Sequence, residues 1–167
     1  MRVRPTWVII ALVFTALVAG CGSPSPSPLP SVNVQPEPNP KLVEFEGHIA
    51  EATKRQGQLV QALAKASNGA PAELNIVARR MADWAAAEMQ WLDQHRPDAC
   101  YMSAADAYRA GVRSILSAAS AFVAMSGDPS PSTDAEGQGA GQGLSDGRTA
   151  IEAAASQAKS LRPACSS

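Results

Sequence analysis

The sequence contains few of the residues that nucleic-acid-binding and metal-binding proteins need. Charged residues make up only 17% of its 167 residues, and 14 lysines and arginines nearly balance 15 aspartates and glutamates, which leaves a formal net charge of −1. Nucleic-acid binding depends on clustered lysine and arginine, so no nucleic-acid partner is expected. With two histidines, three cysteines and no CxxC pair, we expect neither a metal site nor a haem.

Sequence motifs of common enzymes are also missing. The chain has no HExxH, no GxSxG and no phosphate-binding glycine loop. Glu44 and His48 form one Glu/His pair, but a di-iron carboxylate bundle requires two such pairs and further glutamates. β-branched residues are scarce, and no useful stretch alternates with period two, which argues against strands. We therefore expect a non-enzymatic, all-α protein without a cofactor.

The first 21 residues have the layout of a secretion signal. Arg2 and Arg4 precede an uncharged run over residues 5–20, and small residues close it. The apolar part, residues 7–19, is shorter than the roughly 20 residues that a membrane-spanning helix needs. A cytosolic core helix, the other alternative, does not require the two arginines in front.

The end of this leader, Leu17-Val18-Ala19-Gly20-Cys21, resembles the lipobox of bacterial lipoproteins. The resemblance implies that residues 1–20 are a cleaved signal peptide and that Cys21 receives diacylglycerol. It also implies that the membrane is a partner through this lipid, on the extracytoplasmic face of a bacterial membrane. Residues 21–40 then form a linker with serines and seven prolines, typical of a polyproline II tether or a disordered segment.

The body of the chain, residues 41–167, shows apolar residues at helical spacing. We expect helices over residues 41–66, 71–94, 103–125 and 144–161. Residues 126–143 are rich in glycine, serine and proline and contain no hydrophobic residue larger than alanine, which predicts a long flexible loop. Short connections between the first three helices favour an antiparallel, up-down four-helix bundle.

This topology predicts that two of the cysteines lie close together. Cys100 precedes the third helix and Cys165 follows the fourth, and these helix ends lie at the same end of an up-down bundle. We therefore expect the two cysteines to meet and, in an exported protein, to form a disulfide. Free or metal-binding thiols are the alternative.

One polar position stands out in the predicted core. Glu88 lies between Trp84 and Trp91 on the apolar stripe of the second helix, and antiparallel packing places it level with His48 and Tyr108. A buried carboxylate needs such hydrogen-bond donors. These side chains predict either a polar layer that fixes helix register, a Glu88 that leans into water, or a small pocket walled by the two tryptophans for a ligand with one polar group.

The sequence favours a membrane-anchored, surface-exposed or periplasmic lipoprotein with a non-enzymatic binding or structural role in the cell envelope, where an envelope protein is a possible partner. The alternative is a helical bundle that binds a small ligand or a metal near Glu88.

Overall fold

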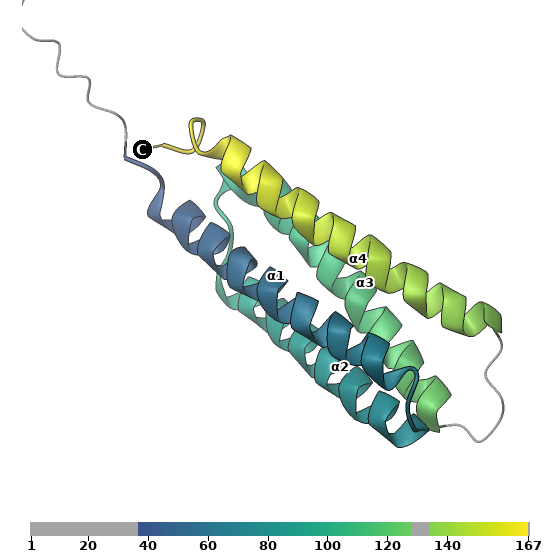
Figure 1. Ribbon diagram of the computed structural model, residues 1–167. Helices are drawn as coiled ribbons and strands as arrows, with labels where there is room; N and C mark the ends of the chain where they lie inside the picture. The colour runs from purple at the N-terminus through teal and green to yellow at the C-terminus, as the bar shows by residue number, and fades with distance from the viewer. Residues whose placement is uncertain (1–36, 128–133, 167) are drawn as a thin grey trace, which may run out of the picture. The chain divides into compact units, whose positions relative to one another are not determined.

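The computed structural model describes residues 37–127 and 134–166, all of which belong to one unit that spans residues 35–167. Four long helices form it: α1 (Pro40–Ala66), α2 (Pro71–Gln94), α3 (Met102–Gly127) and α4 (Asp134–Leu161), with a short 3-10 helix, η1 (Ala99–Tyr101), before α3 (Figure 1). The predicted signal peptide, the lipidation site Cys21 and most of the linker lie outside the described residues.

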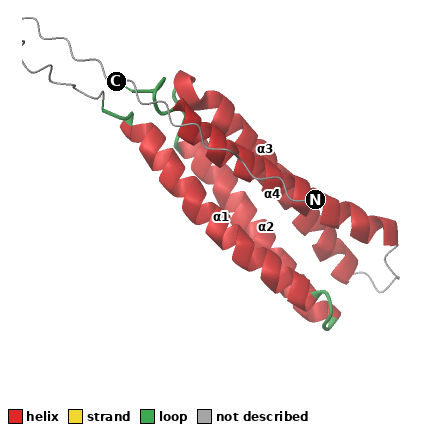
Figure 2. Cartoon of the chain, turned by 45° about the horizontal axis from the view of Figure 1, so that its top comes forward, coloured by secondary structure: helices red, strands yellow, loops and turns green. Residues whose placement is uncertain are grey.

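Consecutive helices run in opposite directions, and α1 packs against α2 and α4 while α3 packs against α2 and α4 (Figures 1 and 2). The described residues contain no strand, apart from a single antiparallel bridge between Pro38 and Ser166. This arrangement confirms the predicted all-α, antiparallel four-helix bundle. Its core is made of inward-facing side chains from all four helices, and the largest fully buried side chains are Tyr108, Leu42, Ile49, Met81, Leu92, Ile115, Ile151, Gln56 and Val112.

The ends of α1 follow from its local sequence. Asn39 is the N-cap, and its side-chain oxygen accepts hydrogen bonds from the backbone N–H groups of Lys41 and Leu42 at 2.9 and 3.3 Å. Pro40 occupies the first helical position, where its missing N–H costs nothing. The helix ends at Ala66, and residues 67–70 lead into α2, which begins at Pro71 as predicted.

The connection between α3 and α4 corrects the sequence-based expectation. We expected a flexible loop over residues 126–143, but α3 continues to Gly127 and α4 begins at Asp134. Glycine is a poor helix former, so the composition of residues 134–143 argued against a helix. These residues nevertheless form a helix because of tertiary packing. The buried Ala140 extends the inner face of α4 by nearly two turns on the N-terminal side of Gly147.

Glycines hold α3 and α4 close together. A Cβ atom on Gly147 would lie 2.5 Å from Cγ1 of Ile115 and 2.7 Å from the carbonyl oxygen of Gly111. A Cβ atom on Gly143 would lie 3.2 Å from Cβ of Ala118. These glycines therefore serve as contact surface for α3, and no larger residue fits at Gly147 without movement of its neighbours.

By length and composition, the segment Ala99–Gly127 is apolar enough to cross a membrane, alone among the helices in the described part of the chain. The core helix of a bundle has the same properties. Tyr108, Val112 and Ile115 of this segment are fully buried, and α3 packs against both α2 and α4. These apolar side chains of the segment thus belong to the core of the bundle.

Candidate functional site

A polar layer crosses the bundle at Glu88. Its Oε2 atom lies 2.5 Å from Nε2 of His48 on α1, and the hydroxyl group of Tyr108 on α3 donates a hydrogen bond to the same oxygen over 2.7 Å. The three side chains come from three helices and meet at the level that antiparallel packing predicted. Glu88 therefore accepts two hydrogen bonds inside the bundle and does not lean out into water.

Burial and hydrogen bonding act in opposite directions on this carboxylate. Glu88 is only 8% exposed, and burial alone would raise its pKa. The hydrogen bonds from His48 and Tyr108 outweigh that effect and hold the pKa of Glu88 below its usual range. Burial, followed by the negative charge of Glu88, raises the pKa of Tyr108 far above its ordinary value. At neutral pH the layer thus holds an ionised carboxylate and a neutral phenol that donates to it.

The two tryptophans occupy different surroundings, which corrects the predicted pocket. Trp84 is 5% exposed and lies in the core. Its indole N–H makes no hydrogen bond among the described residues, although it lies close enough to Glu88 to help lower the pKa of that carboxyl. Trp91 instead stacks on His48, with ring centroids 3.5 Å apart and planes 2° from parallel. The two indoles therefore do not wall one pocket.

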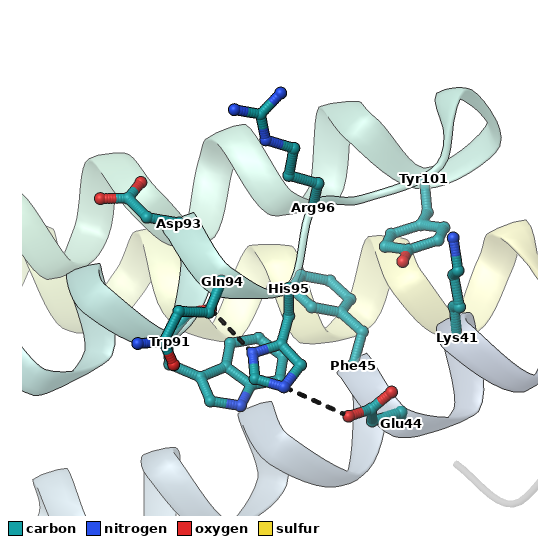
Figure 3. Close-up of a pocket in the computed structure, with 9 residues that line it drawn as sticks. All are labelled: Lys41, Glu44, Phe45, Trp91, Asp93, Gln94, His95, Arg96 and Tyr101. Atoms are coloured by element: carbon teal, nitrogen blue, oxygen red, sulfur yellow. Dashed lines mark hydrogen bonds and ion pairs between the residues drawn. The ribbon is translucent and has the colours of Figure 1, made fainter.

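An aromatic pocket of about 410 Å³ lies beside Trp91, at the end of the bundle where α2 leads into η1 (Figure 3). His95 stacks on Trp91 at 4.4 Å between centroids, and its Nε2 atom lies 3.6 Å from a carboxylate oxygen of Glu44. Phe45 and Tyr101 lie deeper, each 3% exposed, with their ring centroids 5.3 Å apart. The full lining is Lys41, Glu44, Phe45, Trp91, Asp93, Gln94, His95, Arg96 and Tyr101.

Sequence reasoning assigned Trp91 to a pocket but missed most of its neighbours. Phe45 belongs to the apolar residues that recur at helical spacing in the first helix, which predicts a core position rather than a pocket wall. Tyr101 lies in the connection before α3, where periodicity carries no information. The one available signal was the spacing of Trp91 and His95, because residues four apart on a helix meet on one face.

A second hollow of about 600 Å³ opens next to His48 and Glu88. It is lined mostly by polar side chains of α1, namely His48, Glu51, Ala52, Lys54, Arg55 and Gln58, with Glu88 from α2. The five residues predicted to share one pocket are therefore divided. His48 and Glu88 face this polar hollow, Trp91 faces the aromatic pocket, and Trp84 and Tyr108 are core residues.

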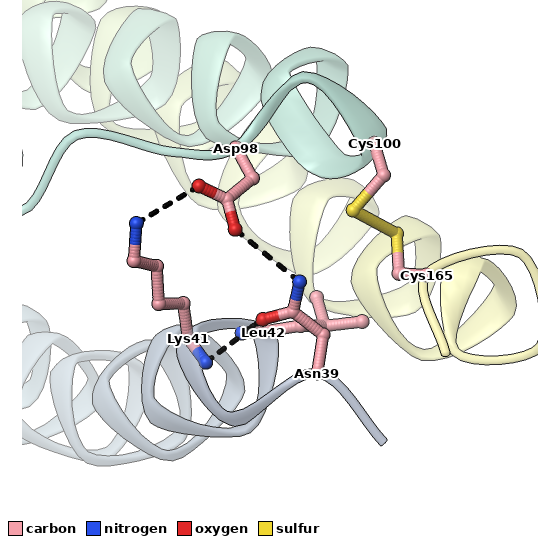
Figure 4. Close-up of polar contacts among 6 residues, drawn as sticks. All are labelled: Asn39, Lys41, Leu42, Asp98, Cys100 and Cys165. Atoms are coloured by element: carbon pink, nitrogen blue, oxygen red, sulfur yellow. Dashed lines mark hydrogen bonds and ion pairs between the residues drawn. A yellow bond between two sulfur atoms is a disulfide. The ribbon is translucent and has the colours of Figure 1, made fainter. Parts of the chain in front are cut away.

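Polar contacts close the bundle end that carries the aromatic pocket (Figure 4). Asp98 accepts hydrogen bonds from the side chains of Asn39 at 3.2 Å and Lys41 at 3.0 Å, which ties the start of α1 to the α2–α3 connection. Just beyond, Cys100 and Cys165 form a disulfide with their Cα atoms 5.6 Å apart. The predicted meeting of these cysteines is thus confirmed. Arg162 also pairs with Glu46 and links α4 to α1.

No protein-family model matches the chain, and no curated protein or solved structure matches it either. Within residues 37–127 and 134–166, no group of three or more histidine, cysteine, aspartate or glutamate side chains could hold a metal ion.

Proposed function

We propose that this protein is an exported lipoprotein, anchored through a lipid on Cys21 to the extracytoplasmic face of a bacterial membrane. Its helical bundle has a non-enzymatic binding or structural role in the cell envelope. The leader supplies the first argument, because residues 1–21 combine a charged start, a short apolar run and a cysteine after small residues.

The disulfide is the observation that carries this proposal. Cys100 and Cys165 are separated by 65 residues in the sequence, yet their Cα atoms lie 5.6 Å apart. Structural disulfides persist in oxidising compartments and are rare in the cytosol. The disulfide thus supports export as a second argument, independent of the leader sequence.

The polar layer supports a non-enzymatic role. Glu88 is nearly buried, and its Oε2 atom already accepts hydrogen bonds from His48 and Tyr108, which hold it ionised. The lowered pKa of Glu88 also makes it a weak proton acceptor at neutral pH. Such a carboxylate fits the role of a fixed register element in a helical core.

Mass spectrometry of protein purified from its native membrane tests the proposal. We expect a chain that begins at Cys21 and carries acyl groups, whereas the variant Cys21→Ser should remain unacylated. Detection of an intact Met1 terminus without fatty acids would overturn the lipoprotein assignment. Thiol labelling of the unreduced protein provides the second measurement, and labelling of Cys100 and Cys165 in native material would contradict residence in an oxidising compartment.

The aromatic pocket favours a second candidate function, the binding of a small ligand with an apolar body. Three aromatic side chains, Phe45, Trp91 and Tyr101, border a volume of about 410 Å³, and charged groups lie at its edge. Anilinonaphthalene sulfonate, an apolar anion, is a suitable probe. We expect saturable binding that weakens at least tenfold in Gln94→Trp, which fills the pocket from its exposed edge. The control Gln138→Trp lies on α4 and should bind normally; equal binding by both variants would exclude this pocket.

A further inference from the structure

One surface at the opposite end of the bundle, formed by α1 and α2, is both apolar and hollow. The hollow has a volume of about 290 Å³ and is lined by Ala62, Lys65, Ala66, Glu73, Ile76 and Val77. We call these six residues the α1–α2 patch. Ile76 is 52% exposed, the largest exposure among the bulky hydrophobic residues of the described chain. Ile76 and the apolar hollow beside it together form the apolar centre of the α1–α2 patch.

The patch holds an exposed apolar side chain and small residues side by side. It carries a protruding side chain, Ile76, next to a depression floored by small residues such as Ala62 and Ala66. In a two-fold symmetric dimer the same patch is used on both subunits, so the protrusion of each copy meets the depression of the other. Ile76 of a second copy of this chain can therefore occupy the depression.

The charges at the edges of the patch select one orientation. Lys65 lies in the last turn of α1 and Glu73 in the first turn of α2, so antiparallel packing around residues 67–70 places them at about the same level on opposite sides of the hollow. Neither belongs to an ion pair found in the described part of the chain. A two-fold axis parallel to the helices would bring Lys65 of one copy opposite Glu73 of the other.

A second pair of charges continues this pattern. Arg55 lies seven residues before Ala62 on α1, and Asp83 lies seven residues after Ile76 on α2, so each extends the same helix face by two turns. Both side chains are exposed. In the parallel two-fold arrangement, Arg55 of one copy lies near the level of Asp83 of the other. An antiparallel arrangement would instead bring like charges together on each helix.

We propose that the α1–α2 patch binds a second copy of this chain, with the two bundles parallel around a two-fold axis. In this dimer both α1 helices begin at the same end, so the two linkers leave on the same side. That geometry suits two chains anchored in one membrane leaflet, where anchoring also raises their effective concentration. The patch itself belongs to the bundle, and its test does not depend on whether Cys21 carries a lipid.

Charge reversal of the full-length chain in its native cells tests the dimer. Two copies with different affinity tags are expressed together and crosslinked, and co-purification is measured. We expect Lys65→Glu paired with itself, and Glu73→Lys paired with itself, to reduce co-purification at least tenfold. Lys65→Glu paired with Glu73→Lys should restore it, because each contact then joins opposite charges. Contacts within a single chain cannot produce this recovery on mixing.

Further variants separate the patch from general effects. Ile76→Asp should abolish co-purification, while Val43→Asp, at another exposed hydrophobic residue, and Lys159→Glu on α4 should leave it unchanged. Circular dichroism melts show whether each variant is folded. The proposal is wrong if wild-type copies do not co-purify, if the mixed pair fails to recover, or if Val43→Asp is as damaging as Ile76→Asp.

Discussion

At the scale of single residues, the central feature is an ionised carboxylate inside a helical core. Hydrogen bonds from His48 and Tyr108 stabilise the charge of Glu88, and the indole of Trp91 stacks on the imidazole ring of His48. Each donor comes from a different helix, so the layer is satisfied only when α1, α2 and α3 are in one register. A slip of any helix would leave a buried charge without partners, which is costly.

We expect Glu88→Gln to lower the free energy of unfolding at pH 7 by about 1–3 kcal/mol, because hydrogen bonds to a charged acceptor are replaced by weaker ones. The folded-state pKa of Glu88 is lowered, so its contribution is present above the unfolded pKa and is lost as pH falls through the folded value. The gap between wild type and variant should therefore shrink below about pH 4.

Urea unfolding at several pH values measures this gap, with Glu51→Gln on the exposed face of α1 as the control. A gap that stays constant into acid would mean that Glu88 is not ionised in the folded protein.

A second residue-scale prediction concerns Gln56, which is 2% exposed and whose amide nitrogen makes no hydrogen bond in the described part of the chain. Burial of an unsatisfied donor destabilises the fold, so Gln56→Leu should raise the free energy of unfolding by about 1–2 kcal/mol. Gln58→Leu, two residues along and exposed, should change it little. Lower stability of Gln56→Leu would instead show that the amide oxygen helps to fix the helix register.

At the scale of elements, α4 is the informative helix. Its sequence contains several glycines and few large apolar residues, so it has little helical preference of its own. Its stability comes from close packing on α3, where Gly111 and Gly147 bring the two backbones together. By contrast, α1 contributes large side chains such as Leu42, Phe45 and Ile49, and its residues follow the expected stripe without correction.

Substitution of glycines in α4 should therefore depend on position. In Gly147→Ala the new methyl group meets Ile115 and the backbone of Gly111 below 3 Å, and we expect a loss of about 1–3 kcal/mol. Gly141→Ala meets nothing within 4 Å and should gain about 0.5–1 kcal/mol from better helix propensity. Thermal unfolding of both variants provides the comparison. Equal effects of the two substitutions would mean that α3 and α4 are farther apart than the structure has them.

At the scale of the whole molecule, the two ends of the bundle differ. One end is closed by the disulfide, by Asp98 with Asn39 and Lys41, and by Arg162 with Glu46. Helix α1 begins at this end, beside the aromatic pocket. The opposite end carries the α1–α2 patch.

Removal of the disulfide should cost a large share of the stability. Closure of a loop of this length contributes roughly 4 kcal/mol in the chain-entropy model. We expect the double variant Cys100→Ser, Cys165→Ser to lose about that amount in urea unfolding. Reductant should lower wild-type stability by the same amount and leave the variant unchanged. A wild type that is insensitive to reductant would show that the two thiols are not bonded in the purified protein.

Local patterns in the sequence by themselves determined the helical spacing of the apolar residues and the ends of α2. The short connections then determined the antiparallel order of the helices. That order in turn places His48, Glu88 and Tyr108 in one layer and the two cysteines at one end. Tertiary structure alone decided where α4 begins, because the cost of glycine in a helix is offset by packing against α3, which the local sequence does not reveal. It also separated Trp84 from Trp91, since side chains seven residues apart share a face, while the depth of each depends on the helices packed around it.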